Sequence, residues 1–235
     1  MRLRRIDDLG DLRGTRVFTR VDFNVPLDDG KIGDDLRITA ALPTIGELRT
    51  RGAAVVLATH LGRPKGRPVD DLRLDPVAAR VQDLGGFSVR KLDEVVGPEV
   101  TRVCAGMEPG DVTLLENLRF DPGEEASDPE FAAALASLAQ FYVDDAFGAA
   151  HRAHASVKGV AERLPAAAGL LMVKEVEVLS RLLNAPEKPF VAILGGAKVS
   201  DKLGVVRALL SLVDAILVGG AMAFTFIAAR NGRVG

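Results

Sequence analysis

The sequence predicts an α/β fold in which a parallel sheet is covered by helices on both faces. Short apolar, β-branched runs recur along the chain, at 15–23, 53–60, 87–92, 111–117, 140–147, 190–196 and 215–220. Segments with helical spacing lie between most of them, and such alternation is typical of parallel sheets. After a turn-rich stretch at 185–189 the alternation starts again. This restart indicates a second α/β domain.

Three of the helical segments carry start and stop signals. We expect helices that are capped by Asp35, Asp75 and Asp128. A proline follows the second and third caps at the first helical position, where its missing N–H is tolerated. Gly52 and Gly85 are expected to end the first two helices.

A fourth helical segment, 170–184, has the pattern of a long amphipathic helix. Its apolar side chains fall on one stripe: Met172, Val176, Leu179 and Leu183. We interpret it as a helix that links two domains, with the boundary near Asn184. The expected organisation is a domain at 1–169, an interdomain helix at 170–184 and a second, incomplete domain at 185–235.

Composition fits a cytoplasmic globular protein and disfavours several functional classes. The 235 residues are 48% hydrophobic and 26% charged, and the formal net charge is -2. This balance offers no general attraction to nucleic acid or to an anionic membrane. The single cysteine, Cys104, cannot form an internal disulfide, has no evident activating base, and is read as structural. The start of the chain has no signal-peptide pattern, and no apolar run is long enough to span a membrane.

Polar and basic side chains follow several predicted strands, where ligands bind in parallel sheets. Asp22 and Asn24 follow the first, and for them a binding role and an ordinary turn are about equally favoured. His60 and Arg63 lie on a Gly/Pro loop after the second, where a solvated basic loop is the simpler reading of any single charge run. Arg119 follows the fourth strand.

Two further arginines complete the set. Arg152 follows the fifth strand between His151 and His154, and Arg37 opposes the dipole in the first turn of a predicted helix. Arginine recognises phosphate and carboxylate in a planar, bidentate manner, so the set predicts a small polyanionic ligand. A zinc site at the two histidines is disfavoured, because the chain has three histidines in all and no cysteine nearby.

The stretch "FVAILGGAKVSDKL" predicts a strand, a glycine turn at Gly195 and Gly196, and a helix start. Backbone N–H groups at such a turn can bind phosphate, although the pattern is not a Walker loop. Lys198 and Lys202 are four residues apart and would share one face of that helix. Taken alone, the stretch slightly favours an ordinary glycine turn with Lys202 as a surface lysine.

Six strings occur together and in order: "RVDFNVP", "THLGRPKG", "LLENLRF", "FYVDDAFGAAHRAHAS", "KPFVAILGGAKVSDK" and "MAFTF". With these strings the chain resembles the phosphoglycerate kinase family over essentially its whole length. The resemblance implies two Rossmann-like domains and reversible phosphoryl transfer between 1,3-bisphosphoglycerate with ADP and 3-phosphoglycerate with ATP. One departure is Ala221, where the family usually has a third glycine of "VGGG".

The resemblance also implies roles for the residues that match its motifs. Asp22 and Asn24 would hold the glycerate, and Arg37 would lie nearest the reacting carboxylate. The phosphate that is not transferred would be held by His60, Arg63, Arg119 and Arg152. Gly195, Gly196, Gly219, Lys198 and Lys202 would bind the nucleotide, and Arg37 and Lys198 would be the catalytic pair.

The family's protein ligand for Mg²⁺ is expected beyond residue 235, together with a second glycine-rich loop and most of the adenine pocket. From the resemblance we therefore expect a fragment of a cytoplasmic, glycolytic kinase that is inactive or nearly so alone, and that is a monomer when complete. Its partners would be 3-phosphoglycerate or 1,3-bisphosphoglycerate and ATP or ADP with Mg²⁺, without nucleic acid or membrane. A stand-alone 3-phosphoglycerate-binding module remains an alternative. A nucleic-acid-binding protein is the least favoured one, because the chain has one tyrosine and no tryptophan.

Overall fold

The computed structural model describes residues 3–28, 30–184 and 186–234. The chain divides into two compact units, Met1–Glu175 and Val176–Gly235, so the division falls inside the long helix α6 (Leu170–Asn184). The expected limits of the second domain, residues 185 and 235, lie outside the described residues.

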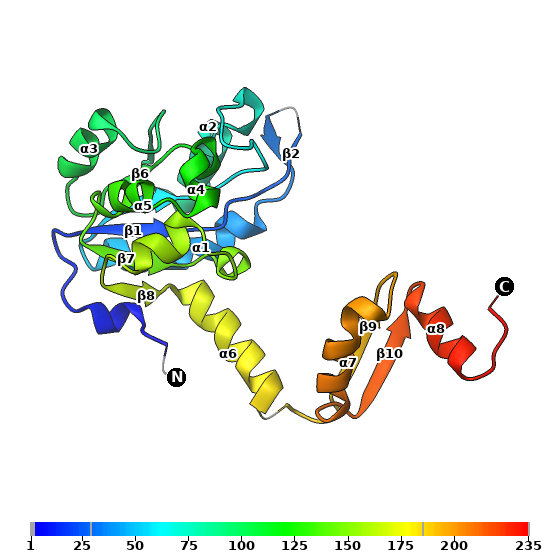
Figure 1. The fold of residues 1–235 in the computed structure, drawn as a ribbon. Coiled ribbons are helices and arrows are strands. Elements are labelled where there is room, and N and C mark those ends of the chain that lie inside the picture. The colour runs from blue at the N-terminus through cyan, green and yellow to red at the C-terminus, as the bar shows by residue number, and fades with distance from the viewer. Residues whose placement is uncertain (1–2, 29, 185, 235) are drawn as a thin grey trace. The chain divides into compact units, whose positions relative to one another are not determined.

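The first unit is built on six parallel strands, which confirms the predicted α/β class (Figure 1). In spatial order these are β5 (Arg90–Lys91), β6 (Val112–Leu114), β4 (Ala54–Ala58), β1 (Arg16–Arg20), β7 (Phe141–Asp144) and β8 (Ala166–Ala168). β1 pairs with β4 on one side and β7 on the other. The observed strands are shorter than the predicted runs: β1 ends at Arg20, before Asp22, and β5 begins only at Arg90.

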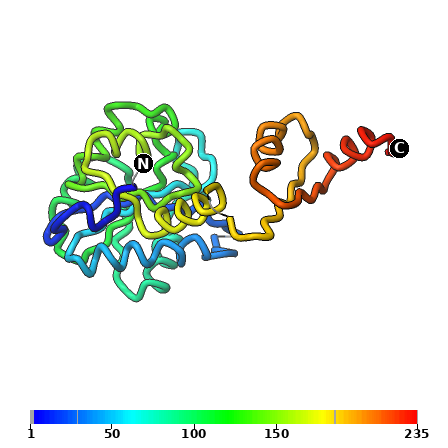
Figure 2. The backbone as a smooth tube through the Cα atoms, turned by 90° about the horizontal axis from the view of Figure 1, so that it is seen from below, coloured from blue at the N-terminus to red at the C-terminus, as the bar shows by residue number. Residues whose placement is uncertain are grey.

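Helices cover both faces of this sheet (Figure 2). One face packs against α1 (Leu36–Thr50), α2 (Asp75–Gly85) and the short helix η1 (Ile6–Leu9). The other packs against α3 (Pro98–Ala105), α5 (Pro129–Ala136) and a π-helix, η5 (Ala155–Gly159). The short elements α4 (Pro122–Ala126), η2 (Asp70–Leu72), η3 (Leu118–Phe120) and η4 (Phe147–Ala149) lie in the loops, as does a small hairpin of β2 (Leu27–Asp28) and β3 (Lys31–Ile32).

The two cores follow from strict alternation in the central strands. Val17 points into the core under α1, and Phe18 points into the core under α5. Both side chains are fully buried, and each such burial stabilises the fold by about 1.5–3 kcal/mol. Cys104 lies in the second core, where burial raises the pKa of its thiol to about 11. It is therefore an unreactive packing residue at neutral pH.

Two of the three predicted caps are placed as expected and one is not. Asp128 accepts hydrogen bonds from the N–H groups of Glu130 and Phe131. Asp35 occupies the cap position of α1, but its carboxylate accepts from Arg80 and from no N–H group of the helix. Asp75, by contrast, is the first residue of α2 and forms an ion pair with Lys91 at 3.1 Å, which leaves Leu74 in the cap position. The predicted stop is also shifted by one residue, because Gly86 rather than Gly85 takes the left-handed conformation.

The second unit contains two parallel strands, β9 (Val191–Gly195) and β10 (Ala215–Gly219). A short turn η6 (Ser200–Lys202) and the helices α7 (Leu203–Leu210) and α8 (Met222–Ala229) complete it. Its strands leave large apolar side chains exposed, such as Ile193 at 78% and Leu217 at 54%. Among the helices of the described residues, none combines the length and apolarity needed to cross a bilayer.

Candidate functional site

The sheet of the first unit has its topological switch point at β1. The chain leaves β1 toward β4 on one side and later returns to β7 on the other, so the loops after these strands diverge at one edge. Ligands of open parallel sheets bind at such a crevice. The residues expected to bind the anion follow β1, β4, β6 and β7, and they therefore share this edge of the sheet, the anion edge: Asp22, Asn24, His60, Arg63, Arg119 and Arg152.

Asp22 and Arg37 form an ion pair at this edge. Arg37 Nη1 donates to Asp22 Oδ2, and Asp22 Oδ1 accepts the N–H of Asn24 at 3.3 Å. The carboxylate offsets the arginine charge that otherwise opposes the dipole of α1. The Arg37 side chain stays 53% exposed, so the pair orients the guanidinium without removing it from solvent.

The backbone N–H and carbonyl of one residue, Gly62, connect Asn24 to Arg119. The N–H of Gly62 donates to Asn24 Oδ1 at 2.9 Å, and its carbonyl accepts from Arg119 Nη1 at 2.8 Å. Gly62 has a φ of +62°, and an added Cβ would lie 2.7 Å from Leu72. Glycine is thus required here on both conformational and steric grounds. With Oδ1 engaged, Asn24 retains its amide N–H groups for a ligand.

Arg119 is almost fully buried beside the acidic side chain of Glu125. Its Nε lies 3.0 Å from Glu125 Oε1, although the angle is unsuitable for a hydrogen bond. Burial lowers the pKa of Arg119, and the positive charges of Arg152 and Arg20 lower it further, against the pull of Glu125 and Glu124. A buried guanidinium with nearby cations favours an anion as its additional partner.

His60 is also buried, with 5% of its surface exposed. Burial is the main cause that lowers its pKa to about 2, followed by the charges of Arg20, Arg119 and Arg152. The imidazole is therefore neutral at pH 7 and can contribute a hydrogen bond, not a positive charge. Arg63 follows on the same loop and is exposed, and Arg152 is half-buried.

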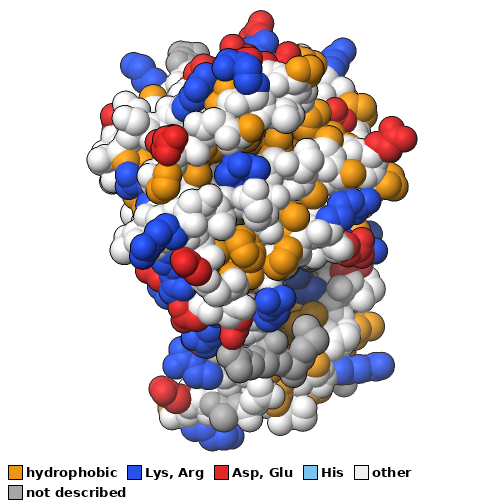
Figure 3. Space-filling view, turned by 90° about the vertical axis from the view of Figure 1, so that its left-hand side faces the viewer, with side chains coloured by type: hydrophobic (Ala, Val, Ile, Leu, Met, Phe, Trp, Pro, Cys, Tyr) orange, Lys and Arg blue, Asp and Glu red, His pale blue; other side chains and the backbone are white. Residues whose placement is uncertain are grey.

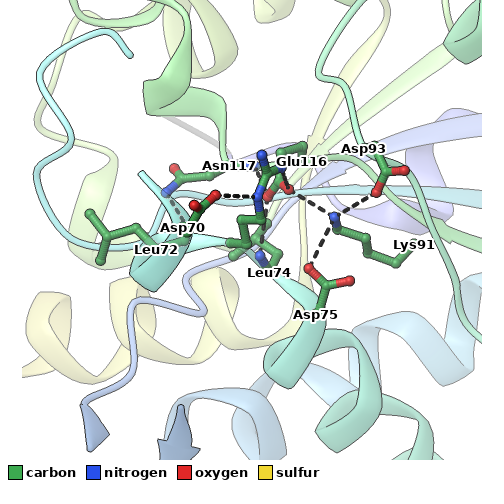
Figure 4. Close-up of polar contacts among 9 residues, drawn as sticks. Asp70, Leu72, Leu74, Asp75, Lys91, Asp93, Glu116 and Asn117 are labelled. Carbon is green, nitrogen blue, oxygen red and sulfur yellow. Dashed lines mark hydrogen bonds and ion pairs between the residues drawn. The ribbon is translucent and has the colours of Figure 1, made fainter. Parts of the chain in front are cut away.

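A polar network that is centred on the buried Glu116 supports these loops from the protein interior (Figure 4). Glu116 is 1% exposed and accepts from Lys91 Nζ at 2.8 Å, from Arg73 Nη1 at 3.3 Å, and from two backbone N–H groups. Burial alone would lower the pKa of Lys91, but its bonds to Glu116, Asp93 and Asp75 together raise it. The network thus has a buried, paired centre at Glu116 and Lys91 with exposed carboxylates around it, and a satisfied buried pair of this kind rigidifies its surroundings.

Asn117 extends this network into the anion edge. Its Oδ1 accepts the N–H groups of Leu61 and Arg119, both at 3.2 Å. Its amide nitrogen donates to the carbonyls of Leu61 at 2.8 Å and Leu72 at 3.0 Å. One fully buried side chain therefore fixes the loop that carries His60 and the turn that carries Arg119.

Sequence reasoning did not find Glu116, Asn117 or the buried Arg20. The available signal was a charged or amide side chain next to an apolar strand: Arg20 ends β1, and Glu116 and Asn117 closely follow β6. Buried polar residues of this kind need partners, and these partners come from distant parts of the chain.

In the second unit, the glycine turns after β9 and β10 pack against each other. An added Cβ on Gly220, which has a φ of +66°, would lie 3.0 Å from the carbonyl of Gly196. Gly195 and Gly219 end the paired strands in register. Ala221 has a φ of −62°, which any residue adopts, so the methyl group that replaces the family's glycine causes no strain.

The prediction that Lys198 and Lys202 share one helix is wrong. Lys198 lies in the loop after β9, and Lys202 ends the turn η6 and caps α7, which begins at Leu203. The physical reason is that a tighter turn replaces the first turn of the expected helix. The stem of Lys202 instead lies over Gly196, where an added Cβ would be 3.1 Å from Lys202 Cε.

Within the part of the chain that the structure describes, no three His, Cys, Asp or Glu side chains gather where they could hold a metal ion. The described residues therefore do not form a Mg²⁺ site of their own.

Comparisons with known proteins agree on one family. The family model described as phosphoglycerate kinase matches residues 6–235. The chain is similar to a curated phosphoglycerate kinase of Dictyoglomus turgidum, with 59% identity over 225 residues, which are 96% of this chain and 57% of that protein.

Two solved structures are similar over nearly all of this chain. A phosphoglycerate kinase from Coxiella burnetii has a TM-score of 0.87 and 40% identity, with 100% of this chain and 59% of the other covered. One from Pyrococcus horikoshii has a TM-score of 0.87 and 34% identity, with 99% and 59% covered. The chain thus spans somewhat more than half the length of these relatives.

Proposed function

Because the chain belongs to the phosphoglycerate kinase family, we propose that its residues 1–169 form the 3-phosphoglycerate-binding domain of such a kinase. The reaction is the reversible transfer of a phosphoryl group from the carboxyl oxygen of 1,3-bisphosphoglycerate to the terminal phosphate of ADP. The bond between the carboxyl oxygen and phosphorus breaks, which leaves the oxygen on the carboxylate, and a bond forms between phosphorus and an oxygen of the terminal phosphate of ADP. Residues 185–235 contribute part of the nucleotide side, and 170–184 link the two.

The observation that carries this proposal is the arrangement of donors at the switch point of the sheet. Asp22 and Asn24 are held there with Arg37 and Arg119 by bonds within the loops. In the proposal, Asp22 and Asn24 hold the glycerate hydroxyl and carboxylate region. His60, Arg63, Arg119 and Arg152 hold the phosphate that stays on the substrate.

Arg37 and Lys198 would face the group in transfer. Phosphoryl transfer needs in-line positioning and stabilisation of negative charge more than covalent work by the protein. Arg37, oriented by Asp22 and half exposed, meets the charge on the carboxyl oxygen. Lys198, Lys202 and the glycine turns at Gly195, Gly196 and Gly219 meet the phosphates of ATP or ADP, with which Mg²⁺ would enter.

The proposal places the complete protein in the cytoplasm as a monomeric glycolytic enzyme without nucleic-acid or membrane partners. Basic and acidic side chains are interspersed on the face shown in Figure 3, and the formal net charge is -2. Such a surface offers little general attraction for polyanions. This supports specific recognition of a small anion over nucleic-acid binding.

Calorimetric titration of the chain with 3-phosphoglycerate tests the proposal. We expect saturable binding that is tighter than binding of inorganic phosphate or of glycerate alone. Arg63→Ala should weaken it about tenfold or more, through loss of charge-assisted hydrogen bonds of roughly 1.5–3 kcal/mol. Arg67→Ala is the matched control, because both arginines are exposed on the same loop. Absent binding, or equal effects of the two changes, would overturn the assignment.

A further inference from the structure

Arg20 is the largest fully buried side chain of the structure, although it carries a charge. It ends strand β1, and every nitrogen of its guanidinium has a partner. Nε lies 3.0 Å from Ser156 Oγ, Nη1 donates to the carbonyl of Val21, and Nη2 lies 2.9 Å from His60 Nδ1. With 1% exposure and each guanidinium nitrogen already in contact with a protein group, Arg20 is placed to act on its neighbours and not on a ligand in solvent.

The contact with His60 determines where the imidazole carries its proton. A guanidinium has only donors, so Nδ1 must be the acceptor and must lack a proton. The ring is neutral, because burial and nearby positive charges keep its pKa far below 7. The single remaining ring proton therefore resides on Nε2.

The charges around this ring come from several elements. Arg20 belongs to β1, Arg119 to η3, and Arg152 and His154 to the segment between β7 and η5, and all of them disfavour a protonated His60. On the far side of Arg20 stands Glu124 of α4, which is fully buried. No single substitution among these groups is expected to make His60 charged at pH 7.

Glu124 balances the buried charge of Arg20 through Ser156. Ser156 Oγ accepts from Arg20 and donates to Glu124 Oε1 at 2.6 Å, while its N–H donates to Oε2 at 2.9 Å. Burial by itself would raise the pKa of Glu124, but His154, Arg20 and Ser156 together lower it, so the carboxylate stays charged. Ser156 lies in the π-helix η5, and such turns are frequent at functional sites.

We propose that Arg20 is a positioning residue that fixes His60 as the Nε2–H tautomer, so that the imidazole presents a neutral N–H donor to a phosphate oxygen. The other tautomer would turn a lone pair toward the anion. The chain Glu124–Ser156–Arg20–His60 serves this purpose without touching the ligand. The role of the N–H rests on the proposed function, whereas the tautomer itself does not.

The tautomer can be read directly from long-range ¹⁵N–¹H spectra of the histidine side chains. The chain has three histidines, and a His60→Asn variant assigns the signals of His60. We expect the signals of a neutral Nε2–H ring that do not change between pH 5.5 and 8. A protonated Nδ1, or a titration of His60 within that range, would overturn the proposal in the unmodified protein.

Variants separate positioning from a merely structural role. Arg20→Lys keeps the charge but cannot reach both Ser156 and His60, so His60 should show mixed tautomers and 3-phosphoglycerate should bind about tenfold more weakly, the equivalent of one hydrogen bond. Ser156→Ala keeps the guanidinium of Arg20 but removes the partner of its Nε. It should give a smaller share of the second tautomer and a smaller loss of affinity for 3-phosphoglycerate. Arg16→Lys, at the other end of β1, should leave both spectrum and affinity unchanged.

The outcomes distinguish this inference from the proposed function. If the unmodified chain shows the Nε2–H tautomer but binds no 3-phosphoglycerate, the proposed ligand is wrong and the tautomer assignment stands. If Arg20→Lys weakens binding while His60 keeps its tautomer, the positioning role is wrong. If Arg20→Lys does not fold, the Ser156→Ala spectrum decides in its place.

Discussion

Two arginines of the anion edge, Arg37 and Arg63, sit in different settings. Arg37 is oriented by the carboxylate of Asp22 at the start of α1, whereas Arg63 extends from an exposed loop. A fixed cation near the reacting oxygen is suited to charge that develops during transfer. An exposed cation on a loop is suited to attracting and holding the bound anion. The two residues should therefore affect different kinetic constants.

In a complete enzyme that carries this sequence, Arg37→Ala should lower kcat by about 10²–10³-fold, the range for loss of one donor to a transition-state charge. KM should change little. Arg63→Ala should mainly raise KM, because it removes ground-state binding. Steady-state kinetics with varied 3-phosphoglycerate gives both constants. Equal effects of both changes on KM alone would contradict this division of roles.

At the scale of elements, helix α6 begins on a buried carboxylate. Asp145 Oδ1 accepts the N–H groups of Leu171 at 2.9 Å and Met172 at 3.2 Å, and Leu170 donates to Thr44 at 2.9 Å. Asp145 Oδ2 is buried and has no hydrogen-bond partner among the described residues. Burial raises the pKa of Asp145 to about 6, although the helix N–H groups and Thr44 pull it down.

This raised pKa makes the stability of the first unit dependent on pH. The unfolded carboxyl has a pKa near 3.9, so folding favours its protonated form. The stabilising contribution is complete below about pH 4 and is lost as pH rises through 6. About two pKa units correspond to roughly 2–3 kcal/mol. The pKa of His60 is lowered, so its contribution to stability has the opposite pH dependence. This contribution is complete above about pH 6.5 and decreases progressively as the pH falls below that value.

Asp145→Asn isolates the carboxyl effect. The asparagine keeps an acceptor for the start of α6 but does not ionise. The free energy of unfolding of the variant should therefore not show the decrease between pH 4.5 and 7 that ionisation of Asp145 causes in the unmodified chain. Urea unfolding followed by far-UV circular dichroism at several pH values measures this. Asp71→Asn, at an exposed aspartate of the same unit, is the control. A pH profile that is identical to the unmodified chain would show that Asp145 is ionised without cost in the fold.

The elements that the sequence predicted best are those whose own residues determine them. β1, β4 and β7 are rich in valine and other strand formers, and α5 has a complete Asp-Pro start. β8 was not predicted, because Ala166–Ala168 has no strand preference and becomes a strand by pairing with β7. The lysine placement failed for a similar reason: the turn η6 depends on packing over Gly196, which local helix signals do not contain.

The same distinction applies to the candidate site. Positions such as Asp22 and Arg119 could be predicted because the carboxyl edge of a parallel sheet is a general binding location. The side chains behind them could not. Asn117 contacts Leu61 and Leu72, more than forty residues away in sequence, and such pairings appear only once the chain is folded.

For the whole molecule, the second unit limits what these 235 residues can do. It has a two-stranded sheet, fewer than the three strands usually needed for independent stability, and exposed apolar side chains such as Phe224. Under the proposed function, we expect a nucleotide held by this unit alone to lack firm alignment. Loss of in-line geometry can remove much of the ~7–11 kcal/mol that positioning supplies.

We therefore expect only background turnover from the 235-residue chain with ATP, Mg²⁺ and 3-phosphoglycerate in a coupled assay. Addition of a separately expressed C-terminal half of a related phosphoglycerate kinase should restore part of the activity, because the exposed apolar surface of β9 and β10 can be covered. A mixture with the N-terminal half of the same relative is the control. Turnover of the chain alone near that of a complete kinase would refute this expectation.

The buried Cys104 has a practical consequence. It is the only thiol of the chain, and it lies on the buried face of α3 in the first unit with 1% exposure. A thiol reagent can reach it only when that core opens, so the labelling rate at neutral pH serves as a clock for the opening of one unit alone. Unfolding that is confined to the second unit should not change the labelling rate of Cys104. The labelling rate of the natural Cys104 therefore reports on the opening of the first unit without an engineered cysteine.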